Sequence, residues 1–227
     1  MLQSPGLLLG MLRIWLLVLA ATVATGVLPA ERLSRGQALE ALVQPDGTTR
    51  LSGVRRLAEI GTLGDVEPLL ERLRDDDAQV RMLAADAMWQ IWGRSGDAEI
   101  DGLYLRGTGE MQDGNLRDAL ATFDRIILRN PDFAEGWNKR AMIRFLLGDY
   151  ENSLMDCDEV FKRNPNHFGA LAGAGQIHVL LGHPEQALDF FRRALAVNPN
   201  LEGPARMKEL IEQHLREEER DRRRHST

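Results

Sequence analysis

The sequence has a single cysteine, Cys157, among its 227 residues. One thiol cannot form a disulfide within the chain, so the sequence excludes a fold held by such crosslinks. A zinc site needs a cluster of Cys and His ligands, and the five histidines show no paired metal spacing. We therefore expect no bound metal, and we expect Cys157 to be a small buried hydrophobic residue.

An excess of positive charge is also absent. The chain has 28 Lys and Arg against 34 Asp and Glu, a formal net charge of -6. Non-specific binding to nucleic acid needs an excess of basic side chains on one face, so this balance argues against a nucleic-acid partner. The hydrophobic fraction of 44% and the charged fraction of 27% are those of an ordinary globular protein with a core of normal size.

Catalytic motifs are missing as well. Gly173 and Gly175 follow no predicted strand and precede no Lys, so they do not form a phosphate-binding loop. The run 75–77 of three Asp lacks the spacing of a calcium loop, and helix capping explains it better. No Ser-His or Cys-His pair is suggested by position. The sequence thus predicts no catalytic residues, no metal ligands and no cofactor.

The N-terminus differs from the rest of the chain. Residues 1–30 contain no acid and one base, Arg13, which precedes an apolar run that ends in small residues. This layout is typical of a secretory signal peptide. An uncleaved membrane anchor is the alternative, because residues 7–28 are nearly long enough to span a bilayer, although Arg13 would lie inside the span.

The sequence favours the signal peptide over the anchor, and a transit peptide comes third. In a bacterial cell both favoured alternatives place residues 31 onward outside the cytoplasm, in the periplasm or anchored to the membrane and facing it. Contact with a membrane is expected only through this segment, if it is not cleaved.

A repeat of 34 residues follows from the Asn-Pro doublets, which end at Pro131, Pro165 and Pro199. The same step relates several sets of positions: Gly114, Gly148 and Gly182; Leu103, Trp137 and Leu171; Gly107, Ala141 and Gly175; Ala119, Ser153 and Ala187; Phe123, Cys157 and Phe191. Each unit is predicted to form two helices, in the middle unit 137–147, ending at Gly148, and 151–163, ending at Asn164-Pro165. Neither helix alone hides its apolar stripe, so the units must stack.

With this repeat length, residues 100–201 resemble three tetratricopeptide repeats (TPRs). The family pattern is carried in the middle unit by Trp137, Ala141, Gly148, Ser153, Cys157, Val160 and Pro165. The sequence departs from it where Glu110, Arg144 and His178 replace the usual Tyr, and where Arg106 and Arg140 replace a Leu. These substitutions are expected either to weaken the packing or to turn that ridge towards a partner. Trp137 shares its position with two leucines, so its ring is expected to pack inside its own unit.

The region before the TPRs has a step of 31 residues, which takes Arg50 to Arg81 and Ile60 to Ile91. It resembles a HEAT-type repeat, with Asp77 as the expected N-cap of a helix. We therefore predict an all-α fold, a right-handed α-α superhelix (TPR solenoid) with HEAT-like N-terminal helices and a C-terminal capping helix. The predicted domains are 1–30, the signal or anchor; 31–96, HEAT-like; 97–201, three TPRs; and 202–227, the capping helix and charged tail. HEAT-like and TPR helices are expected to continue one another in a single stack.

The TPR resemblance also implies a concave groove lined by particular positions of the first helix of each unit. The predicted partner-binding residues are Tyr104, Thr108, Met111, Glu135, Asn138, Met142, Phe145, Ala172 and Gln176, with Asp101, Gly169 and Val179 beside them. Some TPR co-chaperones clamp the carboxylate of a heat-shock chaperone with Lys and Asn. Tyr104 and Thr108 stand where that clamp requires those residues, which argues against such a partner.

"FAEGWNKRA" and "NHFGAL", one repeat later, further resemble secreted or membrane-anchored bacterial TPR proteins. The predicted function is a non-enzymatic scaffold or adaptor of the cell envelope that binds a polypeptide in the groove. The alternative is a regulatory or assembly subunit of a membrane or periplasmic enzyme complex.

Overall fold

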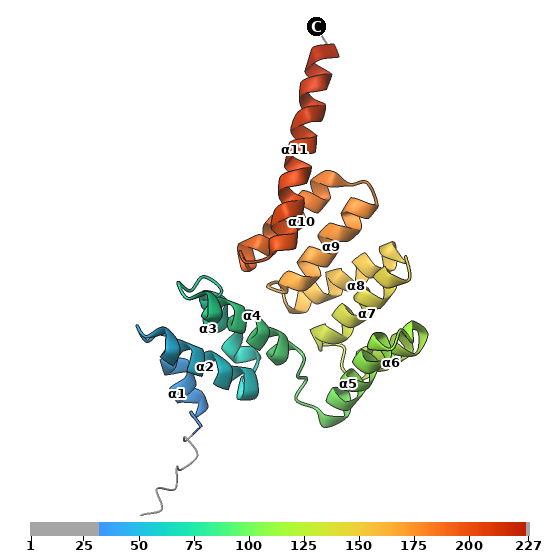
Figure 1. The fold of residues 1–227 in the computed structure, drawn as a ribbon. Coiled ribbons are helices and arrows are strands. Elements are labelled where there is room, and N and C mark those ends of the chain that lie inside the picture. The colour runs from blue at the N-terminus through green and yellow to red at the C-terminus, as the bar shows by residue number, and fades with distance from the viewer. Residues whose placement is uncertain (1–31, 226–227) are drawn as a thin grey trace, which may run out of the picture. The chain divides into compact units, whose positions relative to one another are not determined.

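The computed structural model describes residues 32–225, so the predicted signal or anchor at 1–30 lies outside the described residues. All regular elements within 32–225 are helical, which confirms the predicted fold class (Figure 1). The elements are α1 (Arg35–Ala41), α2 (Gly47–Ile60), the 3-10 helix η1 (Leu63–Asp65), α3 (Val66–Arg72), α4 (Ala78–Trp92), α5 (Ala98–Gln112), α6 (Leu116–Arg129), α7 (Ala134–Leu146), α8 (Tyr150–Arg163), α9 (Phe168–Leu180), α10 (Pro184–Val197) and α11 (Glu202–His225). Among these helices, none combines the length and apolar composition needed to cross a membrane.

Helices α5 to α10 form three helix pairs, one for each predicted repeat. The turn inside each pair contains a glycine with positive φ, namely Gly114 (77°), Gly148 (77°) and Gly182 (73°). Glycine adopts this left-handed conformation at little cost, which explains why the repeat keeps it. The second helix of each pair ends one residue before its Asn-Pro doublet, as predicted. The first helix of the middle pair begins at Ala134, three residues earlier than predicted, because the turn after Asn130 is tight.

Small residues on the first helix of a pair face large ones on the second. A Cβ added to Gly107 would lie 2.8 Å from the ring of Phe123, and one added to Gly175 would lie 2.7 Å from the ring of Phe191. In the middle pair both side chains are of intermediate size: Ala141 takes the place of the glycine, Cys157 takes the place of the phenylalanine, and the two pack in one cluster. The spacing of small and large positions, which recurs in each repeat of this chain, thus sets how closely the two helices approach.

The polar departures from the TPR pattern are paired inside the repeats. Each contacts a residue of the second helix in its own unit: Glu110 with Thr122 (2.7 Å), Arg144 with Asp156 (2.8 Å) and His178 with Phe190 (ring centroids 5.3 Å apart). Arg140 also bonds to Asp156, and reaches Asp124 of the preceding unit at 2.7 Å. Each of these side chains thus has a contact inside its own unit, although Nδ1 of His178 is buried without a hydrogen-bond partner among the described residues. The expectation that this ridge faces a partner stays a prediction.

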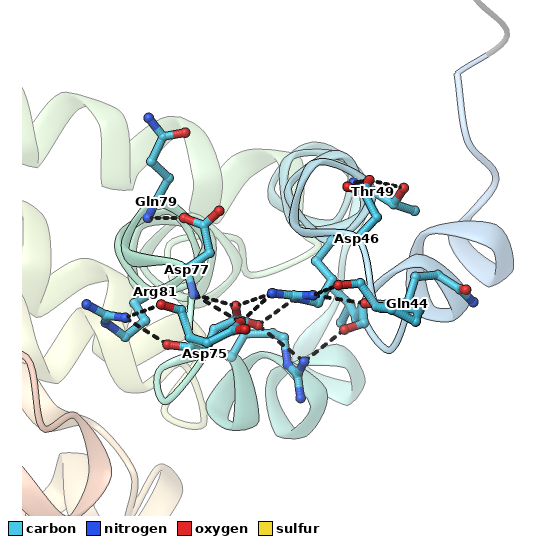
Figure 2. A network of polar contacts seen from close by, with 12 residues as sticks. Gln44, Asp46, Thr49, Asp75, Asp77, Gln79 and Arg81 are labelled. Atoms are coloured by element: carbon cyan, nitrogen blue, oxygen red, sulfur yellow. Dashed lines mark hydrogen bonds and ion pairs between the residues drawn. The ribbon is translucent and has the colours of Figure 1, made fainter.

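A buried ion pair ties the N-terminal helices together, and Figure 2 shows the polar network around its acidic partner, Asp75. Arg50 of α2 donates two hydrogen bonds to Asp75, at 2.8 and 2.7 Å, and bonds to the carbonyl oxygens of Gln44 and Pro45. Asp77 accepts a bond from the backbone N–H of Gln79 at 2.7 Å, which confirms it as the N-cap of α4. The acidic run therefore caps a helix and neutralises an arginine.

Helix α4 does not simply extend the TPR stack. Its apolar face shares a core cluster with Phe168 of α9, while Val197 and Leu201 pack against the same cluster. Asn200, after α10, donates to the carbonyl oxygen of Leu73 at 2.7 Å. The third repeat, distant in sequence, is thus a major neighbour of the N-terminal helices, which differs from the expected sequential stack.

Helix α11 covers the other side of the third repeat. Ile211 is buried, and Met207 and Leu215 pack against Leu188 and Phe191 of α10. This arrangement matches the predicted capping helix, because α11 shields the apolar face of the last repeat from water. Beyond Leu215 the helix continues to His225 with exposed side chains.

Candidate peptide-binding groove

A half-open pocket of about 380 Å³ lies between α7 and α9. Of the nine predicted partner-binding residues, the five that line it are Asn138, Met142, Phe145, Ala172 and Gln176. The neighbouring residue Gly169, also expected in the groove, lines it too. The TPR register therefore brings five of the six predicted positions of the second and third units into one pocket, whereas Glu135 does not line it.

Helical periodicity explains this lining. On α7, Asn138, Met142 and Phe145 follow an i, i+4, i+7 spacing and share one face. On α9, Gly169 and Gln176 are separated by the same two turns. Because these two helices neighbour each other in the array, their faces form opposite walls of the pocket.

The pocket floor comes from Ser153 and Cys157 of α8. The Ser153 hydroxyl donates to the carbonyl oxygen of Ala141 at 2.8 Å and so is already engaged. Burial raises the pKa of the Cys157 thiol to about 12, with Asp156 and Asp158 adding to the shift. The thiol is therefore protonated at neutral pH and serves as an apolar floor, as the sequence predicted.

Trp89 of α4 also lines the pocket, beside residues of α7, α8 and α9. Its indole ring meets the rings of His167 and Phe168 edge-on, with centroids 5.1 and 5.4 Å apart. Gly169 makes room for this ring, because any Cβ there would overlap it. Sequence reasoning missed Trp89, since the HEAT-like period places it on its helix but gives no sign of contact with a repeat 80 residues away.

Two predicted residues, Glu135 and Asn138, belong to a buried polar cluster. The Glu135 carboxylate bonds to His167 Nε2 at 2.8 Å and accepts from the Asn138 amide at 3.0 Å. The backbone N–H of Ala170 donates to His167 Nδ1, so the imidazole carries its proton on Nε2 and donates it to Glu135. Glu135 is only 1% exposed. The Glu135 carboxylate is thus already bonded to side chains of its own chain. Its contact with a partner stays a prediction.

The charge of Glu135 is stabilised despite its burial. Burial alone would raise the pKa of this carboxyl, but the hydrogen bond from His167, followed by the charge of Lys139 and the hydrogen bond from Asn138, outweighs it and lowers the pKa. Burial and the same carboxylate raise the pKa of Tyr104. The cluster thus consists of groups that satisfy one another inside the protein.

The three predicted residues of the first unit do not line the pocket. Tyr104 packs edge-on against Phe123 and Phe133, at 6.1 and 5.7 Å between ring centroids. Met111 packs against the same core. The Thr108 hydroxyl is buried and has no hydrogen-bond partner among the described residues. Their role in binding stays a prediction.

Trp137 packs within its own unit, but between two cations. The guanidinium groups of Arg140 and Arg163 each lie 4.9 Å from its ring centroid. Its indole N–H donates to the carbonyl oxygen of Pro131 at 2.8 Å. The hydrogen bond ties the inter-repeat turn to α7, and the cation–π contacts tie the ring to both helices of the pair. The leucines at the equivalent positions can make neither kind of contact.

Comparison with known proteins agrees with the helix-pair geometry. A tetratricopeptide repeat family model matches residues 104–159, and a second one matches residues 169–201. A TPR repeat-containing protein of Rhizobium etli is 33% identical over 87 residues, which are 38% of this chain and 42% of that relative. The chain therefore matches less than half the length of this curated relative.

Solved structures of TPR proteins are similar to this chain. The first TPR domain of Spaghetti (RPAP3), bound to an HSP90 peptide, has a TM-score of 0.50 and 21% identity, covering 52% of this chain and 95% of that one. The TPR protein YrrB has a TM-score of 0.47 and 18% identity, covering 78% and 99%. The family models therefore place tetratricopeptide repeats at residues 104–159 and 169–201, which include most of α5 to α10.

Proposed function

We propose that this chain binds a polypeptide segment of a partner protein in the pocket between α7 and α9. The proposal depends on one observation: two large apolar side chains of the pocket lining, Met142 and Leu146, are 44% and 58% exposed. Large apolar side chains that rim a hollow are costly to leave in water and are typical of interaction sites. In this proposal the chain acts as a non-enzymatic scaffold or adaptor.

The fold supports this proposal. Stacked helix pairs present their first helices on one side, and such surfaces commonly receive extended segments of other proteins. The TPR domain of Spaghetti (RPAP3) was solved with a peptide bound, which gives a precedent for this use of the fold.

The location of the function is also part of the proposal. Residues 1–30 have the layout of an export signal, so we propose that the protein acts in the cell envelope of a bacterium. Mass determination of the N-terminus of the native protein tests this. A mass that begins near residue 31 supports export with cleavage, whereas a full-length soluble protein in the cytoplasmic fraction would argue against it.

Site-specific crosslinking in cells tests the groove. A photo-crosslinking amino acid is placed at Met142 or Gln176, on opposite walls of the pocket, and in a control at Met155, which is 63% exposed on α8. The two groove positions should crosslink to the same protein, and the control position should not. Identical products from all three positions would contradict binding in the groove.

A second arm uses charge to block the site. Met142→Lys with Gln176→Lys should abolish the product obtained from a probe at Leu146, because it places two cations at the mouth of an uncharged pocket. Met155→Lys with Leu128→Lys adds the same charge at exposed positions of α8 and α6 and should leave the product unchanged.

A further inference from the structure

The side chains that line the pocket carry no formal charge. Among the described residues, its lining comprises Trp89, Asn138, Ala141, Met142, Phe145, Leu146, Ser153, Cys157, Gly169, Ala170, Ala172, Gly173, Gln176 and Ile177. A carboxylate or ammonium group placed there would lose its hydration without gaining a counter-ion. The neutral lining therefore complements a neutral group and rejects a charged one.

The polar atoms of the lining are mostly engaged. Asn138 donates to Glu135 and Ser153 donates to Ala141. The exposed amide of Gln176 lies at the rim, where it is placed to bond with a peptide backbone. The interior thus offers an apolar surface and the rim offers an amide, the combination that receives a nonpolar side chain of an extended chain.

Trp89 gives this pocket a wall that does not come from a TPR. Three aromatic neighbours hold its ring, namely Trp92 at 5.4 Å, His167 at 5.1 Å and Phe168 at 5.4 Å between centroids. Trp89 is partly buried, and it is one of the residues that line this pocket. A ring held in place at the edge of a pocket is a preorganised surface for an apolar group.

We propose, building on the function proposed above, that the pocket receives one uncharged apolar side chain of the bound polypeptide, seated against Trp89. The ligand site is then composite, with α7 and α9 as its walls and α4 as its end. The N-terminal helices take part in recognition by supplying this end wall.

The test uses short blocked peptides and the full chain. Acetylated and amidated Ser-Gly-Xaa-Gly-Ser peptides, with Leu, Met, Phe, Ser, Glu or Lys as Xaa, are titrated while the methyl signal of Met142 and the indole N–H signal of Trp89 are followed by NMR. The Leu, Met and Phe peptides should shift both signals saturably, and their affinity should exceed that of the Glu and Lys peptides at least tenfold. Equal affinity for the charged peptides, or no shift with any peptide, would overturn the proposal.

Two leucine variants separate pocket binding from a change in folding. Gly173 lines the pocket, and a Cβ there would meet no atom of the described chain outside its own helix within 4 Å. Gly173→Leu should therefore fill the pocket without strain and lower the affinity for the Leu peptide at least tenfold. Gly102→Leu, in equally open space on α5, should leave the affinity unchanged. Unchanged binding by Gly173→Leu would place the ligand elsewhere.

The Trp89 part of the proposal has its own readout. Trp89→Leu keeps an apolar side chain but removes the flat ring. It should lower the affinity for the Phe peptide at least fivefold, while the circular dichroism spectrum stays the same. If the crosslinks at Met142 and Gln176 persist while all peptide tests fail, the groove function stands and this inference falls. If the crosslinks fail as well, the proposed function itself is wrong.

Discussion

Gly173 and Gly175 lie two residues apart on α9 and have opposite surroundings. A Cβ at Gly175 would lie 2.7 Å from Cε1 of Phe191, closer than carbon atoms tolerate. A Cβ at Gly173 would project into open space next to the pocket. Both positions have the same helical backbone. Comparing a substitution at one with the same substitution at the other therefore separates the cost of crowding from the benefit of higher helix propensity.

Alanine at these two positions should change stability in opposite directions. Gly173→Ala should raise the free energy of unfolding by about 0.5–1 kcal/mol, because alanine loses less backbone entropy on folding. Gly175→Ala should lower it by about 1–3 kcal/mol, because the crowding of Phe191 outweighs the same entropic gain. Urea unfolding followed by circular dichroism measures both. An equal change of the same sign in both variants would show that the two helices are not in the described register.

The Arg50–Asp75 pair is the second residue-scale feature that the fold depends on. The Asp75 side chain is 2% exposed, whereas that of Asp76, which bonds to the same guanidinium, is 90% exposed. Burial opposes the charge of Asp75, but the hydrogen bonds from Arg50 and from the backbone of Asp77 outweigh it and hold its pKa below the ordinary value. Two adjacent carboxylates on one cation thus differ mainly in burial.

Asp75→Asn should cost about 3 kcal/mol of unfolding free energy, because it removes the buried counter-ion of Arg50 and leaves only the exposed carboxylate of Asp76 beside that guanidinium. Asp76→Asn, the matched control, should cost less than about 1 kcal/mol because that carboxylate is solvated. Chemical denaturation at neutral pH compares them. Equal costs would mean that the buried position of Asp75 does not matter.

The same pair predicts a dependence on pH. Since the folded protein lowers the pKa of Asp75, the unfolded chain binds the proton more tightly. The stabilisation is therefore present above the ordinary pKa of an Asp and is lost as the pH falls below about 4, through the folded pKa. The free energy of unfolding of Asp75→Asn should therefore fall less steeply over that acidic range than that of the parent protein.

Much of this detail at the residue level could be predicted from the repeat alone. The facing positions of Gly107 and Phe123 follow from the family register, as does the turn at Gly148. The pairing of Arg144 with Asp156 could not be predicted, since one sequence shows two polar departures without saying that they compensate each other. The burial of Glu135 also depends on His167, which α4 covers, and that contact lies outside the repeat pattern.

At the scale of elements, α11 has two parts with different roles. Its first half places Ile211 in the core of the third repeat. Its last turns contain exposed ion pairs such as Glu218–Arg222 at 3.7 Å and Glu219–Arg223 at 2.5 Å. Pairs of this kind, exposed and four residues apart, stabilise a helix only slightly. The sequence predicted the apolar face of α11, because helical spacing alone determines it.

Deletion of residues 217–227 should therefore change the free energy of unfolding by less than about 1 kcal/mol, because only exposed pairs are lost. Ile211→Ala in the full chain should cost about 2–5 kcal/mol, because it opens a cavity over α10. Thermal unfolding at low and high salt measures both effects. If the deletion were as costly as Ile211→Ala, the last turns of α11 would have packing contacts that the structure does not show.

Helix α4 is the element whose role the sequence did not predict. Its period relates it to α2, and the sequence predicts its N-cap, Asp77, but its contacts with α9 depend on tertiary folding. Trp92 stacks on His167 with 4.6 Å between centroids, and Arg81 donates to Asn200 at 3.1 Å. Such contacts join segments more than 70 residues apart in sequence, and neither repeat period contains them.

For the molecule as a whole, the described residues contain a core that joins the N-terminal helices to the third repeat. Phe168 is buried in one cluster with Leu57, Met88 and Trp92. A separate cluster joins α10 to α11 and includes Leu188. Repeat proteins often unfold in parts, and the parts that share a core are expected to open together.

Phe168→Ala should cost about 3–5 kcal/mol. Because Phe168 lies in the shared core, hydrogen exchange should speed up in α2 and α4 as well as in α9, although the substitution is in a TPR helix. Leu188→Ala, the control in the other cluster, should speed up exchange in α9 to α11 and leave α2 largely protected. Exchange measured by mass spectrometry on peptides from each helix distinguishes these outcomes. If α4 stayed fully protected in Phe168→Ala, the N-terminal helices would be an independent folding unit, and Trp89 would lose the support that holds it at the groove.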